Sequence, residues 1–361
     1  MPVLRATIGL GMTRQTWTAL VSALLFVALA VPLAILPVPF VAWSPGGTAD
    51  VLGEIDGRPL ISIEGVPTFP TSGQLDLTVV SGTSADSRLT LPEALAAYWL
   101  PGRDTLPRDA VFPPGSSADE VNEAEAQMME TSQDDAVVAA LRAAGQPVER
   151  MPAVSSVTIG GPAYGKLLPG DLIESVDGVD TPDADAVSDQ IRSHRPTEPV
   201  DFVVLRDRVE TTVRVVAARS TTDPGVAVVG ITVGQGYSYT PEITFDLGQQ
   251  IGGPSAGLVF ALGIYDKITA GELLVGRSVA GTGSITPSGD VGSIGGVRQK
   301  LASAEGAGAT VFLVPSGNCA ELAGVRTDMT VVKVSTLGEA ISQLRVLEVP
   351  GGEQRVTRCA G

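Results

Sequence analysis

The sequence has few of the side chains on which enzyme chemistry most often depends. One histidine, His194, and two cysteines occur among 361 residues, so there is no histidine–cysteine cluster for a zinc site. No phosphate-binding loop of the form Gly-x-x-x-x-Gly-Lys-Ser/Thr is present, so nothing indicates the use of ATP. Acidic residues outnumber lysine and arginine by 40 to 24, which argues against nucleic acid as a partner. We therefore expect neither a metal nor a cofactor.

Charged residues are also missing from a long stretch near the N-terminus. None occurs over residues 15–49, and residues 17–41 are almost continuously apolar. A run of this length can cross a bilayer as a helix, and Trp17 and Trp43 flank it as interfacial aromatic residues do. The sequence predicts a transmembrane anchor over residues 17–43.

The charges on either side of this anchor indicate its orientation. Arg5 and Arg14 precede it and acidic residues follow it. Residues 1–16 are therefore expected in the cytoplasm, and the bulk of the chain is expected outside the cytoplasmic membrane. The alternative is a secretory signal peptide cleaved after Ala28-Leu29-Ala30. The apolar run continues well beyond that point, which favours an uncleaved anchor.

Beyond the anchor, strand and helix patterns alternate and predict an α+β fold in four parts. Residues 102–117 are expected to form a loop because they are rich in glycine and proline. The four parts are residues 44–145, an extracytoplasmic region that can form the first part of the main domain; residues 146–220, a compact β-rich domain; residues 226–347, a mixed domain; and residues 348–361, a C-terminal tail.

The β-rich domain contains the run GPAYGKLLPGDLIESVDG, from Gly161 to Gly178. In this run it resembles the bacterial PDZ domain, which carries the same Gly-x-Ala, Leu-x-x-Gly-Asp-x-Ile and Asp-Gly steps. The resemblance implies peptide binding by strand addition, but the sequence does not reveal the glycine-rich loop that would hold a peptide carboxylate. His194 ends the helix of this domain and is expected to be a surface residue without a function.

A serine motif raises the question of catalysis. Residues 253–257 read Gly-Pro-Ser-Ala-Gly, the G-x-S-x-G pattern that presents a nucleophilic serine in α/β-hydrolases. In that fold the histidine that activates the serine follows it in the chain, whereas His194 precedes Ser255. The α/β-hydrolase interpretation therefore fails, and Ser255 needs a different base.

Lysine is the remaining candidate for this base, and the chain contains only four lysines. On the helix predicted from Val297, the apolar residues Val297, Leu301 and Ala304 form one stripe. Lys300 falls inside that stripe, whereas Gln299 is expected to point elsewhere. Burial can lower the pKa of a lysine from about 10.4 to about 7–8, where the neutral amine can act as a general base. The alternative is a structural lysine whose stem covers the core while its ammonium group reaches water.

The serine motif and the segment VAGTGSITPSGDVGSIGGVRQK, which ends at Lys300, resemble the proteolytic domain of the Lon protease family. In that family the serine is the nucleophile and the lysine is the general base. The resemblance assigns these roles to Ser255 and Lys300, gives Thr282 in the first strand of a hairpin a supporting role, and implies a hexameric ring. The chain departs from ATP-dependent members because it has no ATPase module and has Gly252 where they carry an acidic residue. The resemblance is therefore to the Lon-like, PDZ-containing, membrane-anchored branch.

Together these patterns predict an ATP-independent serine endopeptidase that cleaves extracytoplasmic or membrane-associated proteins with a serine–lysine dyad. The fold expected from the resemblance is a Lon-type proteolytic domain with an inserted or preceding PDZ-like domain. If the PDZ-like domain is inserted, residues 61–144 pack against residues 226–347. The alternative is a non-catalytic membrane scaffold that binds peptides through the PDZ-like domain, with Ser255 and Lys300 as packing residues.

The two cysteines form an even pair in a chain expected to lie in an oxidising compartment. Cys319 follows a predicted strand, and Cys359 lies near the end of the C-terminal tail. Such pairs usually bridge outside the cytoplasm. The sequence therefore predicts a structural disulfide that ties the tail to the main domain.

Overall fold

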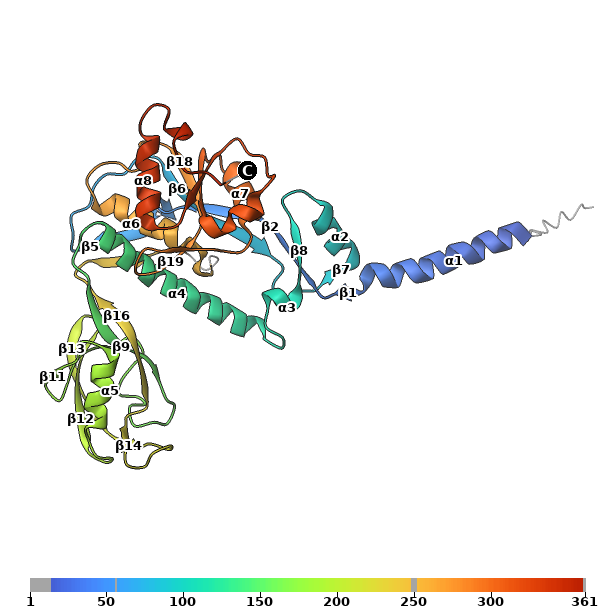
Figure 1. The fold of residues 1–361 in the computed structure, drawn as a ribbon. Helices are drawn as coiled ribbons and strands as arrows, with labels where there is room; N and C mark the ends of the chain where they lie inside the picture. Colours follow the sequence, from blue (N-terminus) through green and yellow to red (C-terminus); the bar gives the residue numbers. More distant parts are fainter. Residues whose placement is uncertain (1–13, 56, 248–251, 360–361) are drawn as a thin grey trace, which may run out of the picture.

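The computed structural model describes residues 14–55, 57–247 and 252–359. Figure 1 shows three parts, which are a projecting N-terminal helix, a mixed α/β body and a β-rich domain that extends from one end of the body. Arg5, and with it most of the segment predicted to be cytoplasmic, lies outside the described residues. The body carries the predicted catalytic residues.

The projecting helix α1 spans Arg14–Ile35, and its side chains are exposed. It is long and apolar enough to cross a membrane. A signal sequence near an N-terminus can have the same length and composition. The predicted end of the anchor at residue 43 is wrong. Strands β1 (Pro37–Val38) and β2 (Phe40–Asp50) follow the helix, and Val41 is fully buried in the body. The apolar run is long because it joins two elements, so its length no longer argues against a signal peptide.

The body is built on a six-stranded sheet with the order β22-β21-β18-β6-β2-β8. Strand β6 pairs in parallel with β18, and β2 and β8 add antiparallel strands on the other side. Segments before and after the β-rich domain therefore share one sheet. The bounds are β6 Gln74–Gly82, β8 Asp104–Pro107, β18 Ser278–Gly281, β21 Val311–Pro315 and β22 Thr330–Val334.

Helices cover both faces of this sheet. Helices α4 (Ala118–Ala143), α6 (Gly257–Ile268) and α8 (Leu337–Leu347) share one buried apolar cluster with β6, β18, β21 and β22. Helix α7 (Val297–Gly306) packs in a second cluster that contains Ala280, Phe312 and Val314. These residues alternate along β18 and β21 with members of the first cluster, so α7 lies on the opposite face of the sheet.

The remaining short elements connect these layers. Residues 102–117, predicted as a loop, contain the edge strand β8 and helix α3, so that prediction is wrong in part. The other bounds are β3 Glu54–Ile55, β4 Arg58–Pro59, β5 Ile61–Glu64, β7 Leu89–Thr90, α2 Leu91–Trp99, α3 Arg108–Val111, β17 Glu242–Phe245, η1 Pro254–Ala256, β19 Ser284–Ile285, β20 Val291–Gly292, η2 Ser316–Leu322 and η3 Gly352–Gln354.

The β-rich domain has its own antiparallel sheet, with the order β13-β12-β10-β9-β16, and its own apolar core (Figure 1). Helix α5 packs against β10 and β16. The bounds are β9 Glu149–Val157, β10 Leu172–Val176, β11 Val179–Asp180, α5 Ala184–Arg192, β12 Pro199–Arg206, β13 Val209–Val216, β14 Ala218–Arg219, β15 Ala227–Val228 and β16 Ile231–Ser238.

The predicted start of the mixed domain at residue 226 is wrong, because β15 and β16 belong to the β-rich domain. Strand β16 pairs with β9 from Ile231 to Ser238, and Val229 lies in the β-rich core. The description of His194 as a plain surface residue is also wrong. Its Nε2 lies 3.0 Å from a carboxylate oxygen of Asp177 and its Nδ1 lies 3.0 Å from the carbonyl oxygen of Gln190, so the ring fastens α5 to a neighbouring turn.

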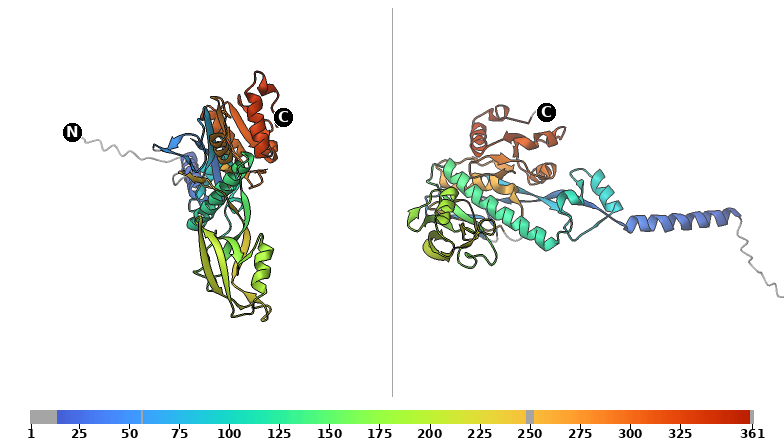
Figure 2. Two further views of the ribbon diagram at one scale, coloured as in Figure 1. Left: turned by 90° about the vertical axis from the view of Figure 1, so that its left-hand side faces the viewer. Right: turned by 60° about the horizontal axis from the view of Figure 1, so that its bottom comes forward.

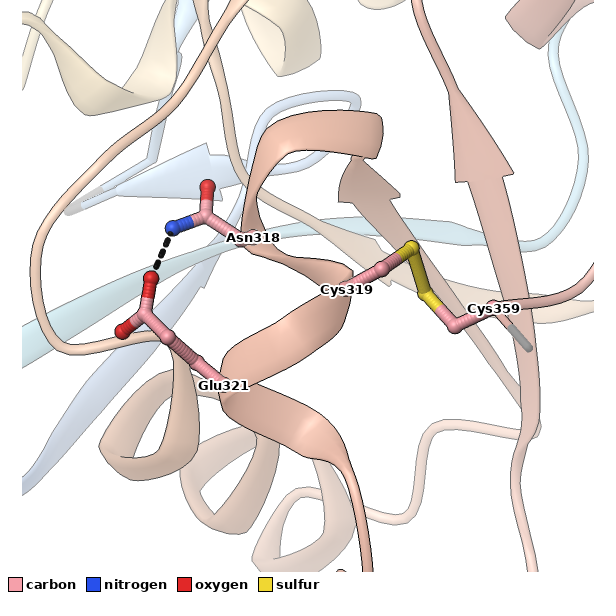
Figure 3. Close-up of a disulfide and its surroundings, with 4 residues drawn as sticks. All are labelled: Asn318, Cys319, Glu321 and Cys359. Carbon is pink, nitrogen blue, oxygen red and sulfur yellow. Dashed lines mark hydrogen bonds between the residues drawn. A yellow bond between two sulfur atoms is a disulfide. The ribbon is translucent and has the colours of Figure 1, made fainter. Parts of the chain in front are cut away.

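A disulfide joins Cys319, in the turn η2, to Cys359 in the C-terminal tail (Figure 3), with the Cα atoms 5.2 Å apart. Beside it, the Asn318 amide donates a 2.6 Å hydrogen bond to Glu321 and a 2.8 Å hydrogen bond to the carbonyl oxygen of Ile294. The Asn318 side-chain oxygen also accepts a hydrogen bond from the Ile294 N–H. The turn thereby braces the loop that leads into α7.

Candidate active site

Ser255 lies in the turn η1, immediately before α6. Gly253 has a φ of +85°, a conformation that favours glycine, and Pro254 occupies the first helical position, where its missing N–H removes no hydrogen bond. These two residues explain why the chain turns sharply here and leaves Ser255 half-buried at the start of a helix. Helix starts carry N–H groups without intrahelical partners and a partial positive charge.

Lys300 lies on α7, the helix that starts after Gly296 in the left-handed conformation. Its side chain is buried, with the residue 4% exposed, and its Nζ lies 2.5 Å from Oγ of Ser255. Burial lowers the pKa of Lys300 to about 8 because the charged form loses its hydration. The structure therefore brings Ser255 and Lys300, which are distant in sequence, into direct contact.

Thr282 is fully buried beside this pair. It follows strand β18, and the hairpin is formed by β19 and β20, so its placement in the first hairpin strand is wrong by one element. The Lys300 amine donates a 3.2 Å hydrogen bond to Oγ1 of Thr282. That hydroxyl donates in turn to the carbonyl oxygen of Ser255 at 3.0 Å. Because the hydroxyl proton is committed to Ser255, Oγ1 is held as an acceptor for Lys300.

Helix α4 supplies contacts that sequence reasoning missed. Ser132 is buried, and its Oγ donates a 3.0 Å hydrogen bond to the carbonyl oxygen of Pro254, the residue before Ser255. An oxygen of the Glu125 side chain lies 3.1 Å from the position that a Cβ of Gly252 would occupy. A carboxylate from α4 thus fills the space beside Gly252. Nothing in the local sequence indicates these contacts.

Gln299 contradicts the prediction that it points away from the core, because it is 1% exposed. Its Nε2 donates a 2.8 Å hydrogen bond to Asp104 on the edge strand β8, and its Oε1 is buried without a partner among the described residues. The helix bearing Lys300 therefore packs on strands β2 and β6 and is also hydrogen-bonded to β8, the edge strand of the same sheet.

The serine and the lysine lie in a cleft of about 660 Å³. Trp43, predicted to be an interfacial residue, lines this cleft instead, because β2 carries it into the body. Phe112, Asn122 and Glu125 also line the cleft. Within residues 14–55, 57–247 and 252–359, no group of three or more histidine, cysteine, aspartate or glutamate residues could hold a metal ion.

Residues 250–346 match the family described as the Lon protease (S16) C-terminal proteolytic domain. The chain is 34% identical over 102 residues to Lon protease 2 of Syntrophobacter fumaroxidans, covering 27% of this chain and 12% of the relative. It is 32% identical over 108 residues to Lon protease 2 of Bacillus subtilis, covering 30% and 19%. The match thus spans about an eighth of the first relative's length. The segment that matches this family contains both Ser255 and Lys300.

Solved structures similar to about a quarter of this chain include the following two. One is the PDZ domain of the SdrC-like protein of Listeria monocytogenes, at 24% identity and a TM-score of 0.22, covering 23% of this chain and 86% of that one. The other is a protein of Geobacillus thermodenitrificans, at 26% identity and a TM-score of 0.21, covering 22% and 92%.

Proposed function

We propose that this protein is a serine endopeptidase in which Ser255 is the nucleophile and Lys300 is the general base. The contact between a hydroxyl and a buried amine at 2.5 Å carries the proposal, because an amine with its pKa lowered to about 8 is partly neutral at physiological pH. The match of residues 250–346 to the Lon proteolytic family supports peptide-bond hydrolysis as the reaction. The cleft above the pair has room for an extended peptide.

In the first half of the reaction, the neutral Lys300 amine takes the proton of the Ser255 hydroxyl as the oxygen attacks the substrate carbonyl carbon. Backbone N–H groups at the start of η1 and α6 are suited to stabilise the resulting oxyanion. Lys300 then gives its proton to the leaving amine, and the peptide bond breaks to leave an acyl ester on Ser255. In the second half, Lys300 takes a proton from water, the hydroxide attacks the ester, and the proton returns to Ser255.

This assignment predicts how hydrolysis depends on pH. Only the neutral amine can accept the serine proton, and the Lys300 pKa is lowered to about 8. Turnover should therefore be low at pH 6, rise through pH 8 and level off above it, measured as kcat on an unstructured protein substrate. A rate that falls as pH rises from 7 to 9 would contradict the role of Lys300.

The remaining parts of the proposal concern energy and location. The chain contains no phosphate-binding loop, so hydrolysis should not require ATP. The exposed apolar helix α1 supports single-pass anchoring in the cytoplasmic membrane, with the β-rich domain and the body outside. The Lon resemblance further suggests a homo-hexamer. The partners are then protein or peptide substrates and the membrane itself.

The central test measures hydrolysis of an unstructured protein by the full chain in detergent, without ATP. Ser255→Ala and Lys300→Ala should each lose at least about a thousandfold in kcat, as removing one member of a catalytic unit does elsewhere. Lys267→Met is the matched control. Lys267 is a second lysine whose pKa is lowered by burial, but its Nζ contacts the carbonyl oxygen of Ile61. Equal losses in all three variants, or a clear ATP requirement, would overturn the proposal.

A peptide-binding role for the β-rich domain has its own support. Strand β16 lies at the end of the sheet order, beside α5. An extended peptide could add to this strand as peptides do in PDZ domains. The Ser255→Ala protein should then still bind substrate, and blocking β16 with a proline at Val233 should weaken capture without changing hydrolysis of a short peptide. If the unaltered chain shows no hydrolysis while the proline at Val233 still weakens capture, the non-catalytic scaffold alternative is favoured.

A further inference from the structure

Helix α2 (Leu91–Trp99) is built in the reverse of the usual way. Its buried residues are the small ones, Ala94 and Ala97. Its large apolar side chains point outward, with Leu95 at 39%, Tyr98 at 69% and Trp99 at 72% exposure. Surface helices normally turn large apolar residues to the core and polar ones to water. An outward face of this kind needs a partner that is itself apolar.

The place of α2 in the fold indicates which partner this is. Strand β1 starts two residues after α1 ends and pairs with β7, with Pro37 opposite Thr90. Thr90 is also the N-cap residue of α2. Helices α1 and α2 are in contact, and Figures 1 and 2 show α2 beside the end of α1 that joins the body. The pairing of β1 with β7 therefore holds α2 beside the C-terminal end of α1.

The charge on α2 is compatible with an apolar partner. Glu93 is the single charged residue within its bounds. The carboxylate of Glu93 accepts hydrogen bonds of 2.8 Å from both the N–H and the hydroxyl of Thr90. These bonds hold its pKa below the ordinary value and keep it at the start of the helix. The charge is thus held more than one helical turn away from the exposed aromatic rings.

We propose that Leu95, Tyr98, Trp99 and the C-cap residue Leu100, which is 46% exposed, form a membrane-docking face that sits in the interface of the bilayer that α1 crosses. The inference rests on the anchoring part of the proposed function, since α1 places the membrane surface next to α2. Tryptophan and tyrosine favour the headgroup region because their rings are apolar and their N–H and O–H groups stay hydrated. A helix lying in this plane buries its apolar face below the headgroups. Two points of attachment, α1 and α2, would fix how the body and its cleft stand over the membrane.

The test uses the full chain in phosphatidylcholine–phosphatidylglycerol vesicles, with an environment-sensitive thiol label on single introduced cysteines. The native cysteines are paired in a disulfide, so labelling without reductant is selective. The probe position is Tyr98→Cys. Leu24→Cys, 71% exposed on α1, reports insertion of the anchor, and Val209→Cys, 64% exposed on the β-rich domain, is the matched control away from α1. Circular dichroism checks that each labelled protein is folded.

Lipids carrying a nitroxide quencher near the headgroup should quench the label at Tyr98, and lipids with a deep quencher should quench the label at Leu24. The label at Val209 should respond only to aqueous iodide. If lipid quenches the label at Leu24 while the label at Tyr98 responds only to aqueous iodide, as the label at Val209 does, the docking face is overturned. The membrane anchor would still be supported. A Tyr98 label shielded from both lipid and iodide would indicate a second protein copy instead and would also overturn it. Absence of lipid quenching at Leu24 as well would show that the anchor has failed, and the docking face with it.

Discussion

The β-rich domain and the body each bury an ionisable side chain, but they surround it with different partners. In the β-rich domain, Asp171 is 2% exposed, and Arg206 donates two 2.7 Å hydrogen bonds to its carboxylate while the Leu168 N–H donates a third. In the body, Lys300 is 4% exposed, and its hydrogen bonds go to two hydroxyls. The Asp171 carboxylate is paired with the oppositely charged Arg206. The Lys300 amine has no such partner among these contacts, and its lowered pKa makes it partly neutral.

Under the proposed function, this difference separates structural from catalytic use of ionisable side chains. A buried charge with a bidentate partner holds strands together and is satisfied in its charged form. A buried amine that faces hydroxyls is unfavourable when charged, so its pKa falls into the range useful for proton transfer. Sites where a buried ionisable group lowers the stability of the fold in this way are expected to be functional.

The largest effect should follow from breaking the matched pair. Arg206→Met leaves the Asp171 carboxylate buried without its partner, which should cost the β-rich domain about 3–5 kcal/mol in free energy of unfolding. Hydrogen exchange of strands β10 and β12, followed by mass spectrometry on the full chain, should accelerate while α6 in the body keeps its protection. Unchanged exchange in the β-rich domain would show that the pair is not structural.

Arg214→Met is the matched control for that experiment. Arg214 also makes a bidentate contact with a carboxylate, that of Asp201, but its side chain is 69% exposed. An exposed ion pair contributes little because water screens it and the side chains lose entropy in forming it. Exchange in this variant should stay close to that of the unaltered chain. Equal losses in the two variants would remove burial as the explanation.

The next effect has the opposite sign. Lys300→Met removes a buried amine whose pKa is lowered from 10.5 to about 8, and methionine fills a similar volume. The variant should gain on the order of 3 kcal/mol in free energy of unfolding at neutral pH while losing activity. Urea unfolding, with hydrogen exchange of α6 as the reporter for the body, measures the gain.

The pH dependence of this gain follows from linkage. Between pH 8 and pH 10.5 the unfolded chain keeps a proton on Lys300 that the folded chain has released, so the unaltered protein becomes more stable as pH rises through this window. The advantage of Lys300→Met should therefore be full below pH 8 and shrink toward pH 10.5. Ser255→Ala, which keeps the lysine, should show no comparable gain. A constant difference across this range would mean that the effect is not electrostatic.

The sequence singled out Ser255 and Lys300, which the structure brings into contact, through local signals. The apolar stripe of α7 placed Lys300 inward, and the glycine and proline around Ser255 indicated a sharp turn before a helix. The contacts of Ser132 with Pro254 and of Gln299 with Asp104 had no such signal. They join residues that only the fold brings together, so residue spacing carries no information about them.

The predicted domain boundaries were wrong where the same residue types suit two different environments. The apolar run after α1 reads equally well as a membrane helix or as a strand buried in a core, and Val41 belongs to the second. Pro37 and Pro39 were weak signals of the helix end, because proline disfavours a helix interior but Pro32 lies inside α1. Strand β16 has an extended pattern that suits either domain, and only its pairing with β9 assigns it.

The smallest effect should come from Thr282, for which we propose the role of orienting the Lys300 amine. A neutral amine has two hydrogens and one lone pair. If one hydrogen goes to Oγ1 of Thr282 and the lone pair faces Ser255, the amine is aligned to take the serine proton. Thr282→Val removes this guide, so kcat at high pH should fall roughly tenfold, the equivalent of about 1.4 kcal/mol, in line with one lost hydrogen bond. The ammonium form also loses an acceptor, so the midpoint of the pH profile should move to lower pH. Thr282→Ser keeps the hydroxyl and should restore both the rate and the midpoint. A valine variant that slows turnover without moving the midpoint, or a serine variant that restores neither, would reduce Thr282 to a packing residue.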